Sequence, residues 1–477
     1  MPRSTTSSSG SDPVSPVSDS TSSGSDSTSS GSDSAAPVEG GAAVTAFDDV
    51  PLNRFHLRIT ALTFCANASD GYELGIISIA LPLIAAQLGF GTVWEGLLGA
   101  SALIGIFAGS VVVGWAADRI GRQRLYTWNF LLIAVASAAE FFVTGPAQLF
   151  VLRLLIGIGI GADYALGPTL VAEFVPRRYR GGLLASLTVL WTVGYVVAFF
   201  LGNYVVGLGD DAWRWLLASS SLPAVAVVLL RIGVPESPRW LLARGRVEQA
   251  RQVVSRLGGD QAAFASLARA GRTSSETVRA RYRDLFGPAH WRSTAFGVVF
   301  YNAQVVPYFA IYTFLPLVLL KMGVGEEDST SDGLLNLFLL AGSLAGLWFV
   351  AKSTRRGLTV WSFAVLIASL APMAIWPDAP TALLFPLFLV FTFTMSAAVN
   401  LDQVYPAELF PTDLRSSGVG LLNGLSRVGS AIGTFLLPLS LDHLGFSPTM
   451  LVLTLVLVAG LLASLAWAPE TKNVALD

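Results

Sequence analysis

The sequence predicts an all-α membrane protein whose twelve transmembrane helices form two six-helix bundles, repeated in the same orientation. Three observations lead to this fold class: the composition, the distribution of Lys and Arg along the chain, and an internal repeat. Of the 477 residues, 53% are hydrophobic and only 13% are charged. Because soluble domains carry about 25% charged residues, this balance excludes an ordinary soluble protein.

Hydrophobic residues gather in long blocks with few charges, each close to the ~20 residues that cross a bilayer as a helix. Twelve such blocks cover roughly 57–88, 95–117, 124–145, 147–172, 182–207, 213–234, 292–320, 333–351, 358–376, 381–405, 416–440 and 448–468. A soluble protein buries one or two such segments. The number of blocks therefore indicates a bundle of membrane spans.

The blocks divide the chain into five parts. Residues 1–50 are rich in Ser, Asp and Gly and cannot bury enough apolar surface to fold, which predicts a disordered cytoplasmic tail. The other parts are an N-terminal six-helix bundle, a cytoplasmic loop with short helices, a C-terminal six-helix bundle and a cytoplasmic tail, at 51–235, 236–291, 292–468 and 469–477. Apolar residues recur at helical spacing over 247–257, which predicts a short helix lying against the bundle.

The positive charges fix the orientation of the spans. With the N-terminus inside, nearly all of the 30 Lys and Arg fall on the inner side, Arg231 among them at the inner end of span 6. Only Arg214 and Lys321 fall outside, and Arg153 and Arg427 lie within spans. Because Lys and Arg accumulate in cytoplasmic loops, both termini are expected in the cytoplasm of a multi-pass plasma-membrane protein.

The two halves of the chain repeat each other. The run E-F-V-P-R-R-Y-R-G starts at Glu173, and the matching run E-L-F-P-T-D-L-R-S starts at Glu408. The motif P-E-S-P-R-W at 235–240 returns as P-E-T-K-N at 469–473, with an offset that differs from the first by a single position. A nearly constant offset in two separate loops indicates two halves in parallel orientation. Spans 2 and 8 each also carry a G-x-x-x-G pair typical of close helix packing: Gly105/Gly109 and Gly342/Gly346.

The loop motifs resemble those of a known superfamily. Residues 114–124 read G-W-A-A-D-R-I-G-R-Q-R, similar to the major facilitator signature G-x-x-x-D-R-x-G-R-R except at Gln123. The P-E-S-P-R-W and P-E-T-K-N motifs look like the two loop signatures of sugar porters. The resemblance implies the major facilitator fold and an inner gate built from these loops. The residues assigned to that gate are Asp118, Arg119, Gly121, Arg122, Glu173, Arg180, Glu236, Arg239, Glu408, Arg415 and Glu470.

The motifs resemble two branches of the superfamily, and these branches carry different classes of solute. The fourth span, R-L-L-I-G-I-G-I-G at 153–161, resembles both sugar porters and phosphate–proton symporters. Asp163 and Tyr164 just beyond it match the phosphate and metabolite symporters, and the run 70–73, D-G-Y-E, is similar to their D-x-Y-D. The seventh span lacks both the Q-L-S-G-I-N run of sugar porters and the acid of phosphate symporters. Neither solute class is assigned outright.

Four charges inside spans are candidates for proton coupling: Asp70, Glu73, Arg153 and Asp163. A charge near the bilayer centre costs at least ~2.5–3.5 kcal/mol and usually faces a partner or a water-filled cavity. At ~1.5 Å per residue, Glu73 and Arg153 lie ~24 and ~30 Å above the inner end, and Asp70 and Asp163 ~20 and ~15 Å. We expect a Glu73–Arg153 ion pair that opens on protonation, and a proton shared by Asp70 and Asp163. The alternative is a static network that pins the two helices together.

Polar and aromatic residues on the spans are candidates for solute contact. They are Tyr72, Tyr164, Trp191, Gln304, Tyr308, Tyr312 and Asn400. Lipid-facing or packing roles remain open for each ring, and Asn400 could equally cap or gate with Asp402. Arg427 also needs a partner, for which an anionic solute is one candidate. Glu140 is expected near the outer interface, in contact with solvent.

Together these features predict a secondary active transporter: a proton-coupled symporter that imports a small polar organic solute, sugar-like or an organic anion, by alternating access. An uncoupled facilitator or a proton-driven exporter of the same fold is the alternative, followed by a phosphate symporter, a membrane enzyme or a non-transporting sensor. The sequence has no H-E-x-x-H, no Cys/His cluster and no G-x-S-x-G, so we expect no catalytic residues, metal or cofactor. Its expected partners are the solute, the proton and the lipid bilayer, without nucleic acid, and it is expected to be a monomer.

Overall fold

The computed structural model describes residues 53–207, 209, 211–276, 282–324, 329–376 and 378–472. The tail expected to be disordered, 1–50, lies outside these residues. The elements up to residue 231 are α1 (Arg54–Leu88), α2 (Thr92–Ile120), α3 (Arg122–Ala139), η2 (Glu140–Phe142), α4 (Pro146–Phe174), α5 (Arg177–Val206), α6 (Ala212–Ser219) and α7 (Ser221–Arg231). Next come α8 (Pro238–Ala243), α9 (Val247–Arg256), α10 (Gln261–Glu276) and η3 (Tyr282–Phe286). The last are α11 (Trp291–Thr313), α12 (Leu315–Lys321), α13 (Ser329–Lys352), α14 (Arg355–Ile375), α15 (Thr381–Val399), α16 (Leu401–Glu408), α17 (Thr412–His443) and α18 (Phe446–Trp467).

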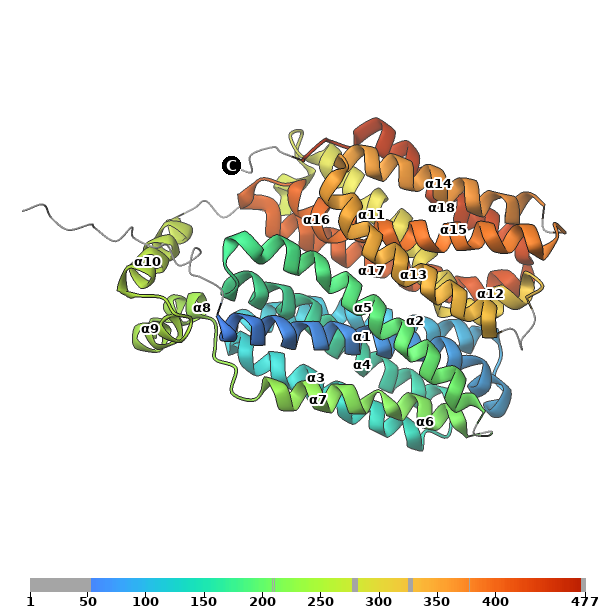
Figure 1. Ribbon diagram of the computed structural model, residues 1–477, viewed down its shortest axis with the longest axis horizontal. Coiled ribbons are helices and arrows are strands. Elements are labelled where there is room, and N and C mark those ends of the chain that lie inside the picture. The colour runs from blue at the N-terminus through green and yellow to red at the C-terminus, as the bar shows by residue number, and fades with distance from the viewer. Residues whose placement is uncertain are drawn as a thin grey trace, which may run out of the picture. The chain divides into compact units, whose positions relative to one another are not determined.

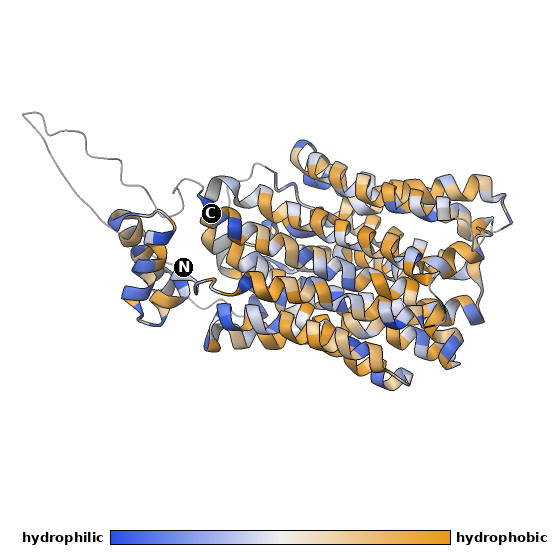
Figure 2. Cartoon of the chain, turned by 60° about the horizontal axis from the view of Figure 1, so that its bottom comes forward, coloured by the Kyte–Doolittle hydropathy of each residue, from blue (hydrophilic) through white to orange (hydrophobic). Residues whose placement is uncertain are grey.

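The fold class predicted from the sequence is confirmed. Twelve helical segments of the described chain are long and apolar enough to cross a membrane, with α6 and α7 together forming the sixth. Figure 2 shows hydrophobic residues along these helices, and the described residues contain no strand. In Figure 1 the helices before residue 235, blue to green, group together, as do those after residue 291, yellow to red.

Local sequence sets the ends of the first helices. The Asn53 side chain accepts hydrogen bonds from the backbone N–H groups of Phe55 and His56, which caps α1 at its N-terminus. Gly89 ends α1 with φ +64°, a conformation that favours glycine. Pro146 begins α4, where its missing N–H would have no helical partner.

Glycines bring the helices of each half close together. A methyl group at Gly105 of α2 would overlap the backbone of Leu154 and Gly157 in α4. The repeat has the same arrangement, because a methyl group at Gly342 of α13 would overlap the Phe393 backbone in α15. The G-x-x-x-G pairs predicted to pack closely therefore do so in both halves.

Contacts between the halves run along two helix pairs, α2 with α17 and α5 with α13. Near one end of the first pair, Thr92 Oγ1 donates a hydrogen bond to Asp442 Oδ2 at 3.1 Å. In the second pair, Thr192 Oγ1 lies 3.3 Å from Ser343 Oγ. The candidate site lies on the surfaces of α1, α4, α5 and α11 that face one another.

The loop between the halves packs on the inner ends of the first helices. α9 buries Ala250, Val253 and Val254, which continue a hydrophobic cluster with residues of α1, α3 and α4. The Asn53 side chain donates to the Leu257 carbonyl at 2.8 Å. The short helix predicted over 247–257 is therefore present and lies against the bundle.

Candidate functional site

The first expected ion pair is formed in the structure. Arg153 Nη1 of α4 lies 2.9 Å from Glu73 Oε1 of α1, and Arg153 Nη2 donates to the Glu73 carbonyl at 3.3 Å. Ser137 Oγ of α3 donates to the same carboxylate at 3.3 Å. Both charged residues are at most 1% exposed. The pair thus joins two helices of the same half away from solvent.

A third charge, which the sequence reasoning missed, completes this cluster. Glu140 was expected near the outer interface and in contact with solvent, and the solvent contact is wrong, because its side chain is fully buried. The chain turns through η2 at the end of α3 and brings Glu140 Oε1 to 3.6 Å from Arg153 Nε. One guanidinium therefore faces two carboxylates, Glu73 and Glu140. We call these three residues the upper cluster.

A second ion pair lies deeper along α4. Arg231 Nη2 of α7 lies 2.6 Å from Asp163 Oδ1, and both residues are at most 1% exposed. Arg231 Nη1 donates to Asn129 Oδ1 at 3.1 Å and also to the Tyr126 carbonyl. The guanidinium lies 3.3 Å from the centre of the Tyr126 ring, at cation–π distance. We call Asp163 and Arg231 the lower pair.

The charge pattern counted Arg231 among the arginines on the cytoplasmic side, at the inner end of its span, but its side chain is fully buried in the bundle. α7 buries Ala224, Val227 and Arg231, which follow one another at spacings of three and four. Such spacing puts three residues on one face of a helix. This pattern could have revealed the buried arginine, but the apparent position of Arg231 at the end of a span concealed it.

Asp70 is a buried acid that forms no ion pair within the described part of the chain. It is 1% exposed, and neither carboxylate oxygen has a hydrogen-bond partner in the described part of the chain. Its electrostatic neighbours are Asp163, Arg231 and Glu73. The expected proximity of Asp70 to Asp163 is therefore present. However, Asp163 is already bound to Arg231, and Asp70 remains as the unpaired acid of the group.

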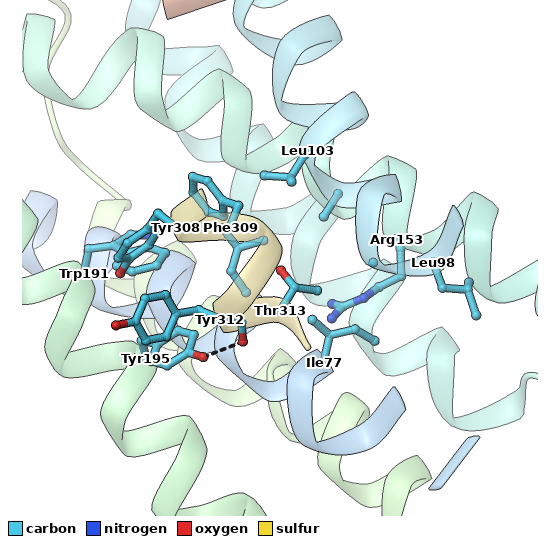
Figure 3. Close-up of a pocket in the computed structure, with 13 residues that line it drawn as sticks. Ile77, Leu98, Leu103, Arg153, Trp191, Tyr195, Tyr308, Phe309, Tyr312 and Thr313 are labelled. Carbon is cyan, nitrogen blue, oxygen red and sulfur yellow. Dashed lines mark hydrogen bonds between the residues drawn. The ribbon is translucent and has the colours of Figure 1, made fainter. Parts of the chain in front are cut away.

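Aromatic rings from both halves line a small cavity beside the upper cluster. The cavity holds about 10 Å³, room for about one water, and its walls come from α1, α2, α4, α5 and α11. Figure 3 shows the rings of Trp191, Tyr308 and Tyr312 on one side and Arg153 on another. Three of the expected solute-contact rings and the expected coupling residue Arg153 therefore line one cavity.

The aromatic rings around the cavity pack against one another. Trp191 stacks on Tyr195 at 5.8 Å between ring centres, and Tyr308 and Tyr312 lie 4.8 Å apart. Tyr195 donates its hydroxyl hydrogen to the Tyr312 carbonyl at 2.9 Å, which ties α5 to α11. Trp191 Nε1 and the Tyr312 hydroxyl are buried, with Tyr164 and Thr392 as their respective polar neighbours in the described chain.

The remaining predicted contact residues are dispersed. Tyr72 lies away from the cavity, with its hydroxyl 2.6 Å from Ser219 Oγ of α6. Asn400 donates to the Ser343 carbonyl at 3.1 Å, which links the end of α15 to α13. Gln304 is buried with its Oε1 unpartnered in the described chain, and Tyr164 lies next to Arg427.

Two residues assigned to the inner gate make the same contact in the two halves. Glu236 accepts hydrogen bonds from the first backbone N–H groups of α3, those of Arg122 and Gln123, at 3.2 Å. Glu470 does the same for α14, accepting from the N–H groups of Arg355 at 3.0 Å and Arg356 at 3.1 Å. A carboxylate at a helix N-terminus is stabilised by the N–H groups and the helix dipole. Burial raises the pKa of Glu470, but these N–H groups and that of Lys472 outweigh it, and the pKa is lowered.

Other gate residues occupy the same inner region. Gly121 joins α2 to α3 with φ +115°, which only glycine adopts readily. The Arg119 guanidinium lies 3.8 Å from the centre of the Trp115 ring. The Glu408 carboxylate accepts two hydrogen bonds from the Arg355 guanidinium, both at 3.0 Å, and the sequence did not predict this contact. Arg239 lies in α8 and Arg415 in the first turn of α17. The side chains of Asp118, Glu173 and Arg180 lie outside the described part of the structure.

Twelve membrane-length helices, buried charges and a small aromatic cavity between two repeated halves are the geometry of a membrane transporter. The profile of the family described as "Sugar (and other) transporter" matches residues 52–477. The chain is 45% identical over 432 residues to the inner membrane metabolite transport protein YgcS of Escherichia coli, covering 90% of this chain and 95% of that one. It belongs to this family of the major facilitator superfamily and is a multi-pass membrane transporter of the sugar and metabolite type.

Two further comparisons bear on the site. The chain is 29% identical to the cis,cis-muconate transport protein of Acinetobacter baylyi, over 77% of this chain and 84% of that one. The fold matches the xylose transporter XylE from E. coli in a partially occluded inward-open conformation, with TM-score 0.75, 19% identity and coverage of 89% of this chain and 100% of that one.

Proposed function

We propose that this protein is a proton-coupled symporter that imports a small polar organic solute, sugar-like or an organic anion, by alternating access. It acts in the plasma membrane as a monomer with both termini in the cytoplasm. The upper cluster carries the proton, and the aromatic residues of the cavity next to it contact the solute when alternating access opens that cavity.

The observation that carries this proposal is the charge balance of the upper cluster. Arg153 supplies one positive charge, Glu73 and Glu140 supply two carboxylates, and none of the three is more than 1% exposed. With both carboxylates ionised, the cluster would hold a net negative charge in a low dielectric, which is costly. A proton on either carboxylate removes that charge.

The position of Arg153 connects the proton to the solute. Arg153 binds Glu73 and also lines the cavity that contains Trp191 and Tyr308. Protonation of Glu73 weakens the ion pair and frees the guanidinium to reorient in the cavity wall. A proton can shift a conformational equilibrium only by binding one state better, and this arrangement supplies such a difference.

The relatives are compatible with both solute classes of the proposal. The structurally similar XylE is described as a proton:xylose symporter, and the relative from A. baylyi is named for a dicarboxylate. The chain thus resembles a carrier of a neutral sugar and a carrier of an organic anion.

The test uses proteoliposomes loaded with the pH dye pyranine and exposed to external D-xylose, gluconate or cis,cis-muconate. We expect at least one solute to acidify the lumen in vesicles with the protein, and none to do so in protein-free vesicles. Uptake of labelled solute without acidification would indicate an uncoupled facilitator. Alkalinisation during uptake would indicate exchange of solute against protons, as in an exporter.

A further inference from the structure

Arg427 lies at the middle of α17, between the two halves of the transporter. It stands midway between Thr412 and His443, the two ends of the helix. Its guanidinium carbon is 5.4 Å from the centre of the Tyr164 ring in α4 and 5.3 Å from that of Phe309 in α11. One ring comes from each half, so the guanidinium points to the space between them.

This guanidinium has no anion bound to it in the described chain. Arg427 Nη1 is buried and lacks a hydrogen-bond partner among the described residues. The acid that acts on it electrostatically is Asp402 of α16, whose two oxygens are buried and also unpartnered there. Two aromatic faces compensate only part of the cost of taking a cation out of water. The site therefore has unused capacity to bind an anion.

The repeat places Arg427 at the position whose counterpart in the first half meets the opposite half. The offset that relates Glu173 to Glu408 also relates Thr192, the neighbour of Trp191, to Arg427. Thr192 contacts Ser343 of the opposite half, as Arg427 contacts Tyr164 of its opposite half. Phe309 lies 6.4 Å from Trp191 between ring centres and so connects Arg427 to the aromatic wall in Figure 3.

We propose that Arg427 binds the carboxylate of the transported solute, which makes the solute an organic carboxylate. This inference rests on the proposed function and names its solute class. The fork of a guanidinium matches the two oxygens of a carboxylate. The rings of Tyr164, Phe309 and Trp191 offer flat apolar faces to the body of the solute. A neutral sugar would leave the half-buried Arg427 beside those rings without an anion.

The test compares three carboxylates with neutral molecules of similar shape: benzoate with benzamide, nicotinate with nicotinamide, and glucuronate with glucose. Thermal unfolding of the purified protein reports binding, because a ligand of the folded state raises the unfolding midpoint. We expect at least one carboxylate to raise the midpoint of the wild type by several degrees, and its neutral partner to leave it unchanged. A midpoint raised by glucose or an amide alone, or by none of the six, overturns the proposal.

Variants separate binding from folding. Arg427→Gln would leave Asp402 buried without a nearby cation, so the double variant Arg427→Gln/Asp402→Asn keeps the charge balance. We expect this double variant to keep the apo midpoint and to bind the carboxylate at least about tenfold more weakly, whereas Asp402→Asn alone still binds it. Arg292→Gln, which removes an exposed arginine beside the Trp291 ring, is the matched control and should bind like the wild type.

The outcomes distinguish this inference from the proposed function. Unweakened carboxylate binding by the double variant shows that Arg427 only balances Asp402 and overturns the inference. In that case proton-coupled uptake of a neutral solute would still stand. Conversely, carboxylate binding that depends on Arg427, without proton-driven accumulation in proteoliposomes, supports the anion site and refutes the symport.

Discussion

Arg231 and Asp163 form a buried ion pair, with 2.6 Å between Nη2 and Oδ1, across two helices whose sequences place the arginine at the membrane edge. The pair is also held by Asn129 and by the ring of Tyr126. Its charges cancel, so the lower pair can persist while the upper cluster changes its protonation. Asp70 then remains as the unpaired acid between the two groups.

The lower pair is expected to stabilise the fold through both members together. Arg231→Gln leaves Asp163 buried without its cation, and we expect a loss of roughly 3–5 kcal/mol in the free energy of unfolding. Adding Asp163→Asn should restore most of that loss. Thermal unfolding of the purified variants measures both effects.

The matched control for the lower pair is the exposed pair of Glu248 and Arg251, 4.0 Å apart. Glu248→Gln should change the unfolding free energy by only about 0–1 kcal/mol. An effect of Arg231→Gln as small as that of Glu248→Gln would show that the buried pair adds nothing to stability.

Glu73 is expected to carry the coupled proton. Glu73→Gln imitates the protonated state, so the variant should bind solute and exchange it, but should not accumulate it against a gradient. Arg153→Ala should be more damaging, because it leaves Glu73 and Glu140 buried without a cation. Uptake into proteoliposomes with an imposed pH gradient measures the accumulation.

Glu140→Gln tests the charge balance of the same cluster. It leaves Arg153 and Glu73 as a neutral pair, which removes the excess negative charge that favours the proton, so accumulation should be weakened while solute binding persists. Undiminished accumulation by Glu73→Gln would exclude this residue as the carrier and direct attention to Asp70 and Asp163.

The orientation of the chain is expected to follow its positive charges. Tags at residue 1, within 240–290 and at 477 should all be cytoplasmic, and a tag at 325–330 should be external. The burial of Arg231 removes one charge from the inner count but leaves the asymmetry, since only Arg214 and Lys321 fall outside. Protease added to intact cells should therefore leave the 240–290 loop uncut, and cleavage there would contradict this orientation.

Glu470 should make the inner end of the C-terminal half sensitive to acid. Because its pKa is lowered in the folded protein, its contribution is present above the ordinary pKa of a glutamate and is lost as the pH falls through the lowered value. We expect the unfolding midpoint of the wild type to fall more than that of Glu470→Gln between pH 7 and about pH 3. Parallel pH profiles of the two proteins would show that the contact at the start of α14 contributes nothing.

Most of the fold could be predicted because its signals are local in the sequence. Twelve apolar blocks, the loop motifs and the G-x-x-x-G pairs each depend on residues close together in the chain. The contact of Glu73 with Arg153 could also be predicted, because a constant rise per residue fixes the depth of a residue along a helix once the ends of the helix are known. Depth alone does not specify direction, and so Asp163 was matched with Asp70 while its bound partner is Arg231.

The sequence by itself therefore determined the membrane class, the number of spans, the repeat and which helices carry charge. Only the tertiary structure decided which charges are paired: Glu140 with Arg153, Arg231 with Asp163, and Arg427 with two rings and, among the described residues, no bound anion. The physical reason is that the burial and pairing of a side chain depend on what packs against its helix. Such neighbours come from distant parts of the chain, and no pattern of spacing within one helix specifies them.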